Sequence, residues 1–312
     1  MVIDYHVHLW QHAPHLPLQA SVDQLGDYCA RAVQLGVTEL AITEHSSRFR
    51  QFDALLRGWW QQDPSLARQA ETSTCWDEEL GADLDQYVEA ALAARAAGLP
   101  TVVGLEVDYF PGQMQKVADL LDGYPFDVLL GSVHWIGAWL FDALDWAEAQ
   151  EQWAARGVER VWHDYTTSVE ELACTGAVDV LAHPDLAKVA GHRPAAPDEF
   201  YDRIADAART CGLAAELNSA GWRKPCAEAY PARRLLARFH DYQVPITTAS
   251  DAHRLHDVAW RIADVCAMAI AVGYTEVSAF RHRGRTPYPL HQGGRSDGLT
   301  GADPVHSTGD AL

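Results

Sequence analysis

Seven short apolar runs alternate with segments of helical pattern, and this alternation constrains the fold more than any other feature of the chain. The runs are rich in Val, Ile, Leu and Ala without strict alternation, which is typical of strands buried on both faces. They cover residues 2–6, 39–43, 101–106, 127–131, 178–182, 213–217 and 245–249. Helical patterns cover residues 22–35, 84–97, 199–211, 230–242 and 258–272. Strand–helix alternation predicts parallel strands, and without a Gly-rich dinucleotide fingerprint it predicts an α/β barrel of TIM type, here with seven strands.

The chain has 312 residues, and the alternation predicts one barrel domain over residues 1–290. Residues 48–80 interrupt the alternation with several Trp and many polar residues, so we expect an insertion or a lid there. Residues 291–312 are rich in Gly, Ser, Asp and Thr and contain almost no large apolar residue, which predicts a disordered tail.

The charge balance excludes several classes of function. The 24 Lys and Arg face 43 Asp and Glu, a net charge of −19, so no basic surface for nucleic acid is expected. No apolar stretch reaches the ~18 residues of a membrane span, and the N-terminus lacks the pattern of a secretory signal. The six cysteines form no C-x-x-C pair, which favours free buried thiols in a cytoplasmic protein. The sequence does not indicate an oligomeric state.

Most of the predicted strands run into residues of metal-ligand type. The strand ends carry His6 and His8, Glu44 and His45, Glu106, His134, His183, Glu216 and Asn218, and Asp251 and His253. In a β/α barrel the carboxyl ends of all strands open on one face, and that face carries the active site. These side chains are therefore expected to converge, although about 250 positions separate the first from the last.

The spacing of these residues suits divalent metals. In His6-x-His8 and Asp251-x-His253 the two side chains point to the same side of an extended chain, so each pair can hold one ion. His with Asp and Glu but no Cys favours Zn²⁺, Mn²⁺ or Fe²⁺. Because the candidates are too many for one tetrahedral ion, we expect two or three divalent ions and no organic cofactor.

The motifs at the strand ends resemble those of the polymerase and histidinol phosphatase (PHP) superfamily. They are Asp4-Tyr5-His6-Val7-His8, Thr43-Glu44-His45, Gly104-Leu105-Glu106, Gly131-Ser132-Val133-His134, His183-Pro184-Asp185 and Ser250-Asp251-Ala252-His253. Two longer stretches, over residues 124–139 and 216–231, resemble its monofunctional histidinol-phosphatase branch. The resemblance implies a distorted (β/α)₇ barrel and a cytoplasmic hydrolase of histidine biosynthesis that converts L-histidinol phosphate to L-histidinol and phosphate.

The resemblance also implies a ligand set of three ions. His6, His8, Glu106 and Asp251 match ligands of the first ion, Glu106, His134 and His183 those of the second, and His45 and His253 those of the third. The family has a further ligand shortly after the H-x-H. Here either His12 or His15 can fill that role, and we favour His15.

The substrate expected from this resemblance is a small phosphorylated molecule. Arg223 and Arg193 are the predicted phosphate contacts, whereas Lys188 is expected to face solvent. Trp135 is a candidate wall for an imidazole ring. We expect attack on phosphorus by a hydroxide that bridges the metals, with Asp251 or His253 as the catalytic acid for the leaving alcohol.

Three alternatives to this assignment remain open. The nearest is another PHP-family phosphoesterase, with a different phosphomonoester or a phosphodiester as substrate. An amidohydrolase-type barrel also begins with H-x-H, but it carries a bridging Lys where this chain has Glu106. A non-enzymatic metal-binding domain would have lost ligands that this chain keeps.

Overall fold

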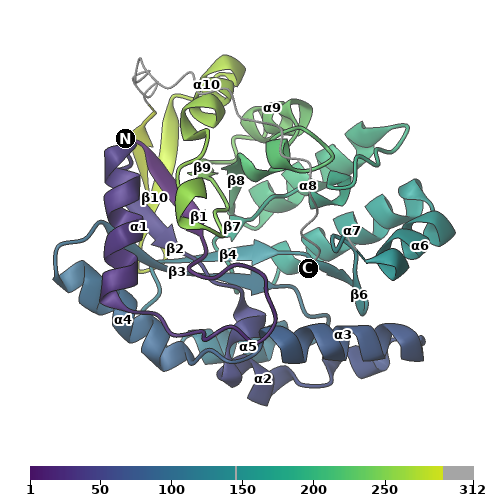
Figure 1. The fold of residues 1–312 in the computed structure, drawn as a ribbon. Helices are drawn as coiled ribbons and strands as arrows, with labels where there is room; N and C mark the ends of the chain where they lie inside the picture. Colours follow the sequence, from purple (N-terminus) through teal and green to yellow (C-terminus); the bar gives the residue numbers. More distant parts are fainter. Residues whose placement is uncertain (145, 291–312) are drawn as a thin grey trace, which may run out of the picture.

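Seven strands pair in parallel and form the inner wall of the molecule, in the order β1-β2-β3-β4-β7-β8-β9 (Figure 1). The computed structural model describes residues 1–144 and 146–290. The strands are β1 (Ile3–Val7), β2 (Glu39–Ile42), β3 (Thr101–Asp108), β4 (Val128–Ser132), β7 (Val180–Leu181), β8 (Ala214–Asn218) and β9 (Ile246–Ala249). A parallel bridge between Val7 and Ala252 brings the first and last strands together. The predicted seven-stranded β/α barrel is confirmed as a nearly closed barrel.

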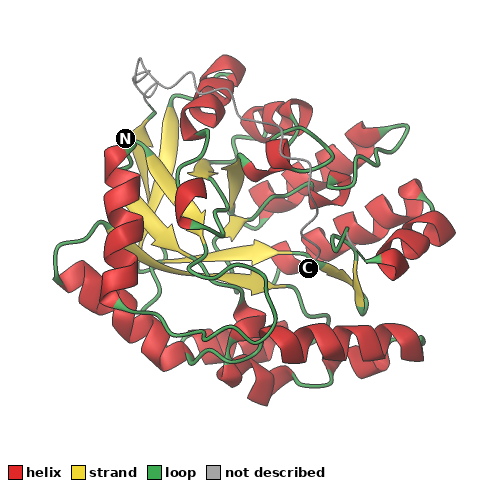
Figure 2. Cartoon of the chain, viewed as in Figure 1, coloured by secondary structure: helices red, strands yellow, loops and turns green. Residues whose placement is uncertain are grey.

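Helices surround the strands and cover the outer face of the barrel (Figure 2). The helices are α1 (Val22–Gln34), α2 (Arg50–Leu56), α3 (Leu66–Glu79), α4 (Leu84–Ala96), α5 (Met114–Leu121), α6 (Ala147–Arg156), α7 (Val158–Ala173), α8 (Pro197–Thr210), α9 (Arg233–Asp241) and α10 (Ile262–Val272). Every residue of β1, β3, β4, β8 and β9 is buried. This burial explains why the apolar runs lack a strict period of two.

The structure also contains two antiparallel hairpins that the sequence analysis did not predict. The hairpin of β5 (Trp135–Ile136) and β6 (Trp139–Leu140) directly follows β4. The hairpin of β10 (Glu276–Arg281) and β11 (Gly284–Pro289) follows α10. β11 is exposed along its whole length and contains two prolines, which are tolerated in an edge strand that needs no donor on its outer side.

Residues 48–80 contain α2, a short 3₁₀ helix (Trp59–Gln62) and α3. Two polar contacts attach this segment to the β5–β6 hairpin. Asp63 accepts the N–H of Ala138 at 3.1 Å, and the hydroxyl of Thr72 donates to the carbonyl of Ala138 at 2.5 Å. The segment therefore buttresses the hairpin next to His134, while the idea of a lid stays a prediction.

Two glycines allow the strands that carry Glu106 and His134 to pack closely. A Cβ at Gly104 would lie 2.8 Å from Cγ2 of Thr43 and 3.1 Å from the carbonyl oxygen of Ile42. A Cβ at Gly131 would lie 2.7 Å from Cγ2 of Val178. The glycines of these two motifs are thus required by packing.

The predicted tail, residues 291–312, lies outside the described residues. Within the described part of the chain, no helix combines the length and apolar character that crossing a membrane requires.

Candidate metal centre

Glu106, near the end of β3, lies at the middle of the residues that the strand ends bring together. Its two carboxylate oxygens lie 2.7 to 3.6 Å from ring nitrogens of five histidines, namely His6, His8, His45, His134 and His183. The Glu106 side chain is only 1% exposed. Five imidazoles from four separate segments therefore surround one buried carboxylate, as predicted from the strand ends.

Asp251 closes the cluster from the side of β9. Its Oδ1 lies 3.9 Å from Nε2 of His6 and 3.6 Å from Nε2 of His8. Its Oδ2 accepts a hydrogen bond from the Asn218 amide at 3.3 Å. The H-x-H pair of β1 thus faces two carboxylates, Glu106 and Asp251.

A second group of rings lies beside His8. The ring centroid of His253 lies 4.0 Å from that of His8, and Nε2 of His253 lies 3.4 Å from Nε2 of His45. The ring of His12 lies 4.6 Å from that of His253 and 5.0 Å from that of His45. These rings bring nitrogen donors together at the more open edge of the cluster, where His253 is 24% exposed.

His12 and His15 differ in what they contact. The ring of His12 lies tilted against the rings of His45 and His253, and His12 hydrogen-bonds Glu79 of α3 at 2.7 Å. Within the described residues, the one contact recorded for His15 is its backbone N–H, which donates to Glu78 at 2.9 Å, and its side chain is exposed. The geometry therefore favours His12, not the expected His15, because the ring of His12 contacts the rings of His45 and His253.

Carboxylates outside the cluster hydrogen-bond two of its rings and face a third. Nδ1 of His6 donates to Glu216 at 2.7 Å, and Nδ1 of His134 donates to Asp108 at 2.6 Å. Oε2 of Glu44 lies 3.6 Å from Nδ1 of His8. The two hydrogen bonds fix the tautomers of His6 and His134 so that Nε2 of each is left to bind a metal. The sequence analysis assigned no role to these acids, although Glu216 and Glu44 stand at predicted strand ends.

Glu44 is itself held by a buried arginine. It accepts the N–H groups of Leu9 and Trp10 and, at 2.7 Å, Nη1 of Arg48. Burial opposes the ionisation of Glu44, but Arg48 and His8 outweigh it and lower its pKa to about 2. Arg48 also donates to Glu79 at 3.1 Å, so it connects the loop after β1 to α3.

The backbone is strained at two of the candidate ligands. His183 has a φ of 27° and Asp251 a φ of 51°, values that residues with a side chain rarely adopt. At His183 the strained N–H donates to Glu216 at 2.7 Å. Strain of this kind persists where the surrounding structure fixes the residue, and it is common at functional sites.

The unpaired atoms of the cluster fit a metal. Buried side-chain atoms without a hydrogen-bond partner include Nε2 of His6, Nδ1 and Nε2 of His8, Oε2 of Glu106 and Nδ1 of His183. Leaving such atoms unpaired is costly unless an ion or ligand binds them. Four groups of three residues have ligand atoms within 4.8 Å of one another: His6, His8 and Glu106; His6, His183 and Asp251; His45, Glu106 and His134; and His8, His45 and His253. Nitrogen and carboxylate donors in overlapping groups suit more than one divalent ion.

The predicted phosphate contacts occupy different environments. Arg223 donates from Nη2 to the carbonyls of Ser250 at 2.8 Å and Asp251 at 3.3 Å, so it lies directly beside the cluster. Arg193 pairs with Glu228 at 2.9 Å and is 41% exposed. The expectation that Lys188 faces solvent is wrong. It is fully buried, because Asp185 and the Ala229 carbonyl satisfy its ammonium group at 2.8 and 2.6 Å.

Trp135, the predicted wall for an imidazole ring, lies next to the cluster. Its ring centroid is 6.0 Å from that of His134, and its indole Nε1 is buried without a partner. It packs edge-on against Trp59 of the 48–80 segment, with ring centroids 5.8 Å apart. The segment thus helps to fix a ring beside the candidate ligands.

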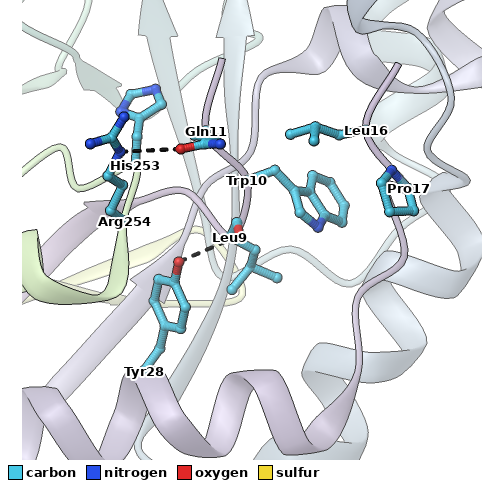
Figure 3. Close-up of a pocket in the computed structure, with 8 residues that line it drawn as sticks. All are labelled: Leu9, Trp10, Gln11, Leu16, Pro17, Tyr28, His253 and Arg254. Carbon is cyan, nitrogen blue, oxygen red and sulfur yellow. Dashed lines mark hydrogen bonds between the residues drawn. The ribbon is translucent and has the colours of Figure 1, made fainter. Parts of the chain in front are cut away.

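A pocket of about 330 Å³ opens beside His253 (Figure 3). Trp10, Leu16 and Pro17 form one wall, and His253 and Arg254 form another. Arg254 donates from Nε to Gln11 at 3.2 Å. The sequence analysis did not name Arg254 as a residue near the site, although it directly follows His253 in the chain.

We expect Glu216→Gln to lower the affinity for metal by roughly 10- to 100-fold. Glu216 accepts from His6 through Oε1 and from the N–H of His183 through Oε2, and a glutamine cannot accept at both atoms. Competition with a chromophoric chelator measures the affinity. Glu39→Gln is the matched control, because Glu39 begins β2 at the opposite end of the barrel. Equal metal affinities of Glu216→Gln and Glu39→Gln would show that Glu216 does not support the metal site.

Known proteins are similar to this chain in sequence. The family profile described as "PHP domain" matches residues 4–220. A protein of Deinococcus radiodurans named "Probable histidinol-phosphatase" is 34% identical over 262 residues, which cover 84% of this chain and 92% of that protein. A protein of the same name from Schizosaccharomyces pombe is 25% identical, with 83% of this chain and 82% of that protein covered.

Solved structures with low sequence identity have the same fold. The histidinol phosphate phosphatase of Lactococcus lactis, complexed with Zn, L-histidinol and phosphate, has a TM-score of 0.67 at 18% identity, with 91% of this chain and 98% of that chain covered. A structure from Listeria monocytogenes that is described as a histidinol phosphatase has a TM-score of 0.64 at 21% identity. The match covers 82% of this chain and 97% of that chain. Both likenesses show the barrel fold.

Proposed function

Because this chain belongs to the PHP domain family, we propose that it is a metal-dependent phosphatase that hydrolyses L-histidinol phosphate to L-histidinol and phosphate. The observation that carries the proposal is the convergence of five imidazoles on buried Glu106. The substrate follows from the relative that is 34% identical over 84% of the chain. We place the reaction in the cytoplasm as part of the same proposal.

We propose nine metal ligands: His6, His8, His12, His45, Glu106, His134, His183, Asp251 and His253. His12 replaces His15 in this set on the strength of its contacts with His45 and His253. Two or three ions of Zn²⁺, Mn²⁺ or Fe²⁺ suit these donors. Such ions supply Lewis acidity toward a phosphoryl group and generate a nucleophile from water at neutral pH.

In this proposal the guanidinium group of Arg223 orients the phosphate. Arg223 is held in place by Asp257 at 2.7 Å, by the Ser250 carbonyl and by stacking on Trp260, with its guanidinium carbon 4.9 Å from the ring centroid. Its side chain is 26% exposed, so it can still reach a ligand above the cluster. A planar guanidinium fixed in this way stabilises the charge that grows on the phosphoryl oxygens.

The leaving alcohol needs a proton, and Asp251 and His253 stand nearest to solvent among the strand-end ligands. Their side chains are 15% and 24% exposed, whereas those of His6 and His8 are fully buried. Oδ1 of Asp251 faces the rings of His6 and His8, whereas Oδ2 accepts the Asn218 amide, so Oδ2 is the atom we assign to carry the proton. Trp135 and the pocket beside His253 are the proposed surroundings of the organic part of the substrate.

We expect Arg223→Ala to raise KM for the phosphorylated substrate by roughly 10- to 100-fold, with a smaller loss in kcat. The reason is the loss of a charged donor next to the cluster. Steady-state kinetics of phosphate release measure both constants. Arg209→Ala is the matched control, because Arg209 lies in the last turn of α8, pairs with Asp206 and is 53% exposed. An unchanged KM in Arg223→Ala would exclude this arginine from the phosphate site.

A substrate panel tests the choice of substrate. The metal-loaded protein is assayed with L-histidinol phosphate, other phosphomonoesters and a bis-aryl phosphodiester. The proposal predicts a kcat/KM for L-histidinol phosphate at least about 100-fold above every other compound, because a site that pairs the polar groups of its substrate rejects analogues that lack them. Uniform weak activity, or activity on the diester alone, would contradict the substrate while leaving the metal centre in place.

A further inference from the structure

Two cysteines lie together at the end of the barrel opposite the metal centre. Cys174 ends α7 and Cys211 ends α8, and each precedes the amino end of the next strand, β7 or β8. Their sulfur atoms are 2.9 Å apart, about 0.9 Å more than the ~2.0 Å of a disulfide bond. The sequence analysis expected free buried thiols, but Cys174 is exposed and Cys211 only partly buried.

The pairing of α7 with α8 holds the two thiols in place. Arg203 of α8 donates to Glu170 of α7 at 2.8 and 2.5 Å and to Thr167 at 3.1 Å. Glu170 lies one helical turn before Cys174, and its carbonyl accepts the Cys174 N–H at 3.3 Å. A small movement of the side chains within this frame suffices to join the sulfurs.

A groove gives small molecules access to the pair. It has a volume of about 430 Å³, and Cys174, Cys211, Arg203 and Tyr242 are among the residues that line it. The other thiols of the chain lack this combination, since Cys29, Cys226 and Cys266 are buried, and partly buried Cys75 does not line this groove. We propose that Cys174 and Cys211 form a reversible redox modification site, which a low-molecular-weight disulfide such as oxidised glutathione converts into an intramolecular disulfide.

The reaction is two successive thiol–disulfide exchanges. Cys174 loses its proton to solvent, attacks one sulfur of the small disulfide and forms a mixed disulfide, and one small thiol leaves. Cys211 then loses its proton, attacks the Cys174 sulfur and releases the second small thiol. The protein dithiol gives up two electrons and two protons, and the small disulfide is reduced to two thiols. Burial and the hydrogen bond to Cys174 raise the pKa of the Cys211 thiol to about 11, which makes exposed Cys174 the first nucleophile.

The cross-link would close a loop of 37 positions that contains His183 and Arg193. Closing a loop restricts mainly the unfolded chain, so the folded state gains stability. The bond forms at the amino ends of β7 and β8, whereas His183 and Glu216 stand toward their carboxyl ends. We therefore expect the disulfide to raise Tm by about 5 °C while the arrangement of the metal centre is unchanged.

To test the proposal, the 312-residue protein is treated with oxidised glutathione. Its intact mass, peptide map and Tm are then measured. We expect a product lighter by two hydrogen atoms, a Cys174–Cys211 peptide, the higher Tm, and reversal by dithiothreitol. Cys211→Ser should stop at a glutathione adduct on Cys174. Cys75→Ser is the matched control and should react like the wild type, because Cys75 belongs to α3, far along the chain from the pair.

Three results would overturn the proposal. One is a wild-type protein that accumulates only the glutathione adduct on Cys174. Another is a disulfide that joins two chains instead of closing within one. The third is an intramolecular bond that still forms in Cys211→Ser.

Discussion

Glu106→Gln is expected to lower kcat for phosphate release by at least about 10³-fold. Glutamine keeps the shape of the side chain, but it removes the charge that faces five imidazoles and replaces one oxygen with an N–H₂ donor. That donor points at the place where a cation would bind, so the loss affects both metal affinity and turnover. In the same variant we expect the content of bound metal to fall.

The experiment compares kcat and metal content in wild type, Glu106→Gln and Glu39→Gln. Glu39 again serves as a control, because it is a strand carboxylate that pairs with Tyr5 and Arg281 instead of the histidines. Circular dichroism confirms that each variant is folded. Near-normal turnover of folded, metal-replete Glu106→Gln would contradict the role of Glu106 as the central ligand.

Arg48→Met is expected to lower the free energy of unfolding by about 3–5 kcal/mol. Arg48 is 1% exposed and pairs with Glu44 at 2.7 Å and Glu79 at 3.1 Å. It also donates to the carbonyl of Trp10 at 2.9 Å. Methionine fills much of the same volume, but it leaves the fully buried carboxylate of Glu44 without its cation. The loop after β1 should loosen as well, and with it the orientation of His8.

Equilibrium unfolding in urea measures this change. Arg57→Met is the matched control, because Arg57 pairs with Asp53 and Asp77 on the surface and is 46% exposed. Surface pairs contribute about 0–1 kcal/mol, so this control should remain close to wild type. Equal losses in the two variants would show that the Arg48 network does not stabilise the fold.

The strand order and the strand-end cluster could be predicted from the sequence because both depend on local patterns. A run such as 127–131 is free of charged residues after Asp127, and β4 indeed spans Val128–Ser132. Since parallel strands of a barrel share one carboxyl end, the residues that follow the runs had to meet. This argument required no knowledge of the loops between them.

The sequence analysis did not predict α2, α3, α5, α6 and α7 as helices, nor the two hairpins. The hairpins and α5 lack a local signal. The strands β5 and β6 have two residues each, which is too short to show any period. The eight residues of α5 give barely two helical turns. In β11 the prolines read as breakers, and only an unpaired outer edge makes them acceptable.

The orienting residues of the site could not be predicted because they act through contacts between distant segments. Asp108 reaches His134 across 26 positions, and Glu216 reaches His6 across 210. The preference for His12 over His15 depends on the path of a loop, which spacing alone does not determine. The candidate ligands could be predicted from their places at strand ends. The residues that orient them could be identified only from the packed structure.

The central claim is that the strand-end cluster binds divalent metal and uses it to hydrolyse a phosphate ester. It is tested most directly by stripping the protein with a chelator and then measuring phosphate release from L-histidinol phosphate as Zn²⁺ or Mn²⁺ is added back. We predict no turnover in the metal-free protein and full recovery once two or three ions per chain are bound, as counted by elemental analysis. Full activity of a protein shown to hold no metal would contradict this account.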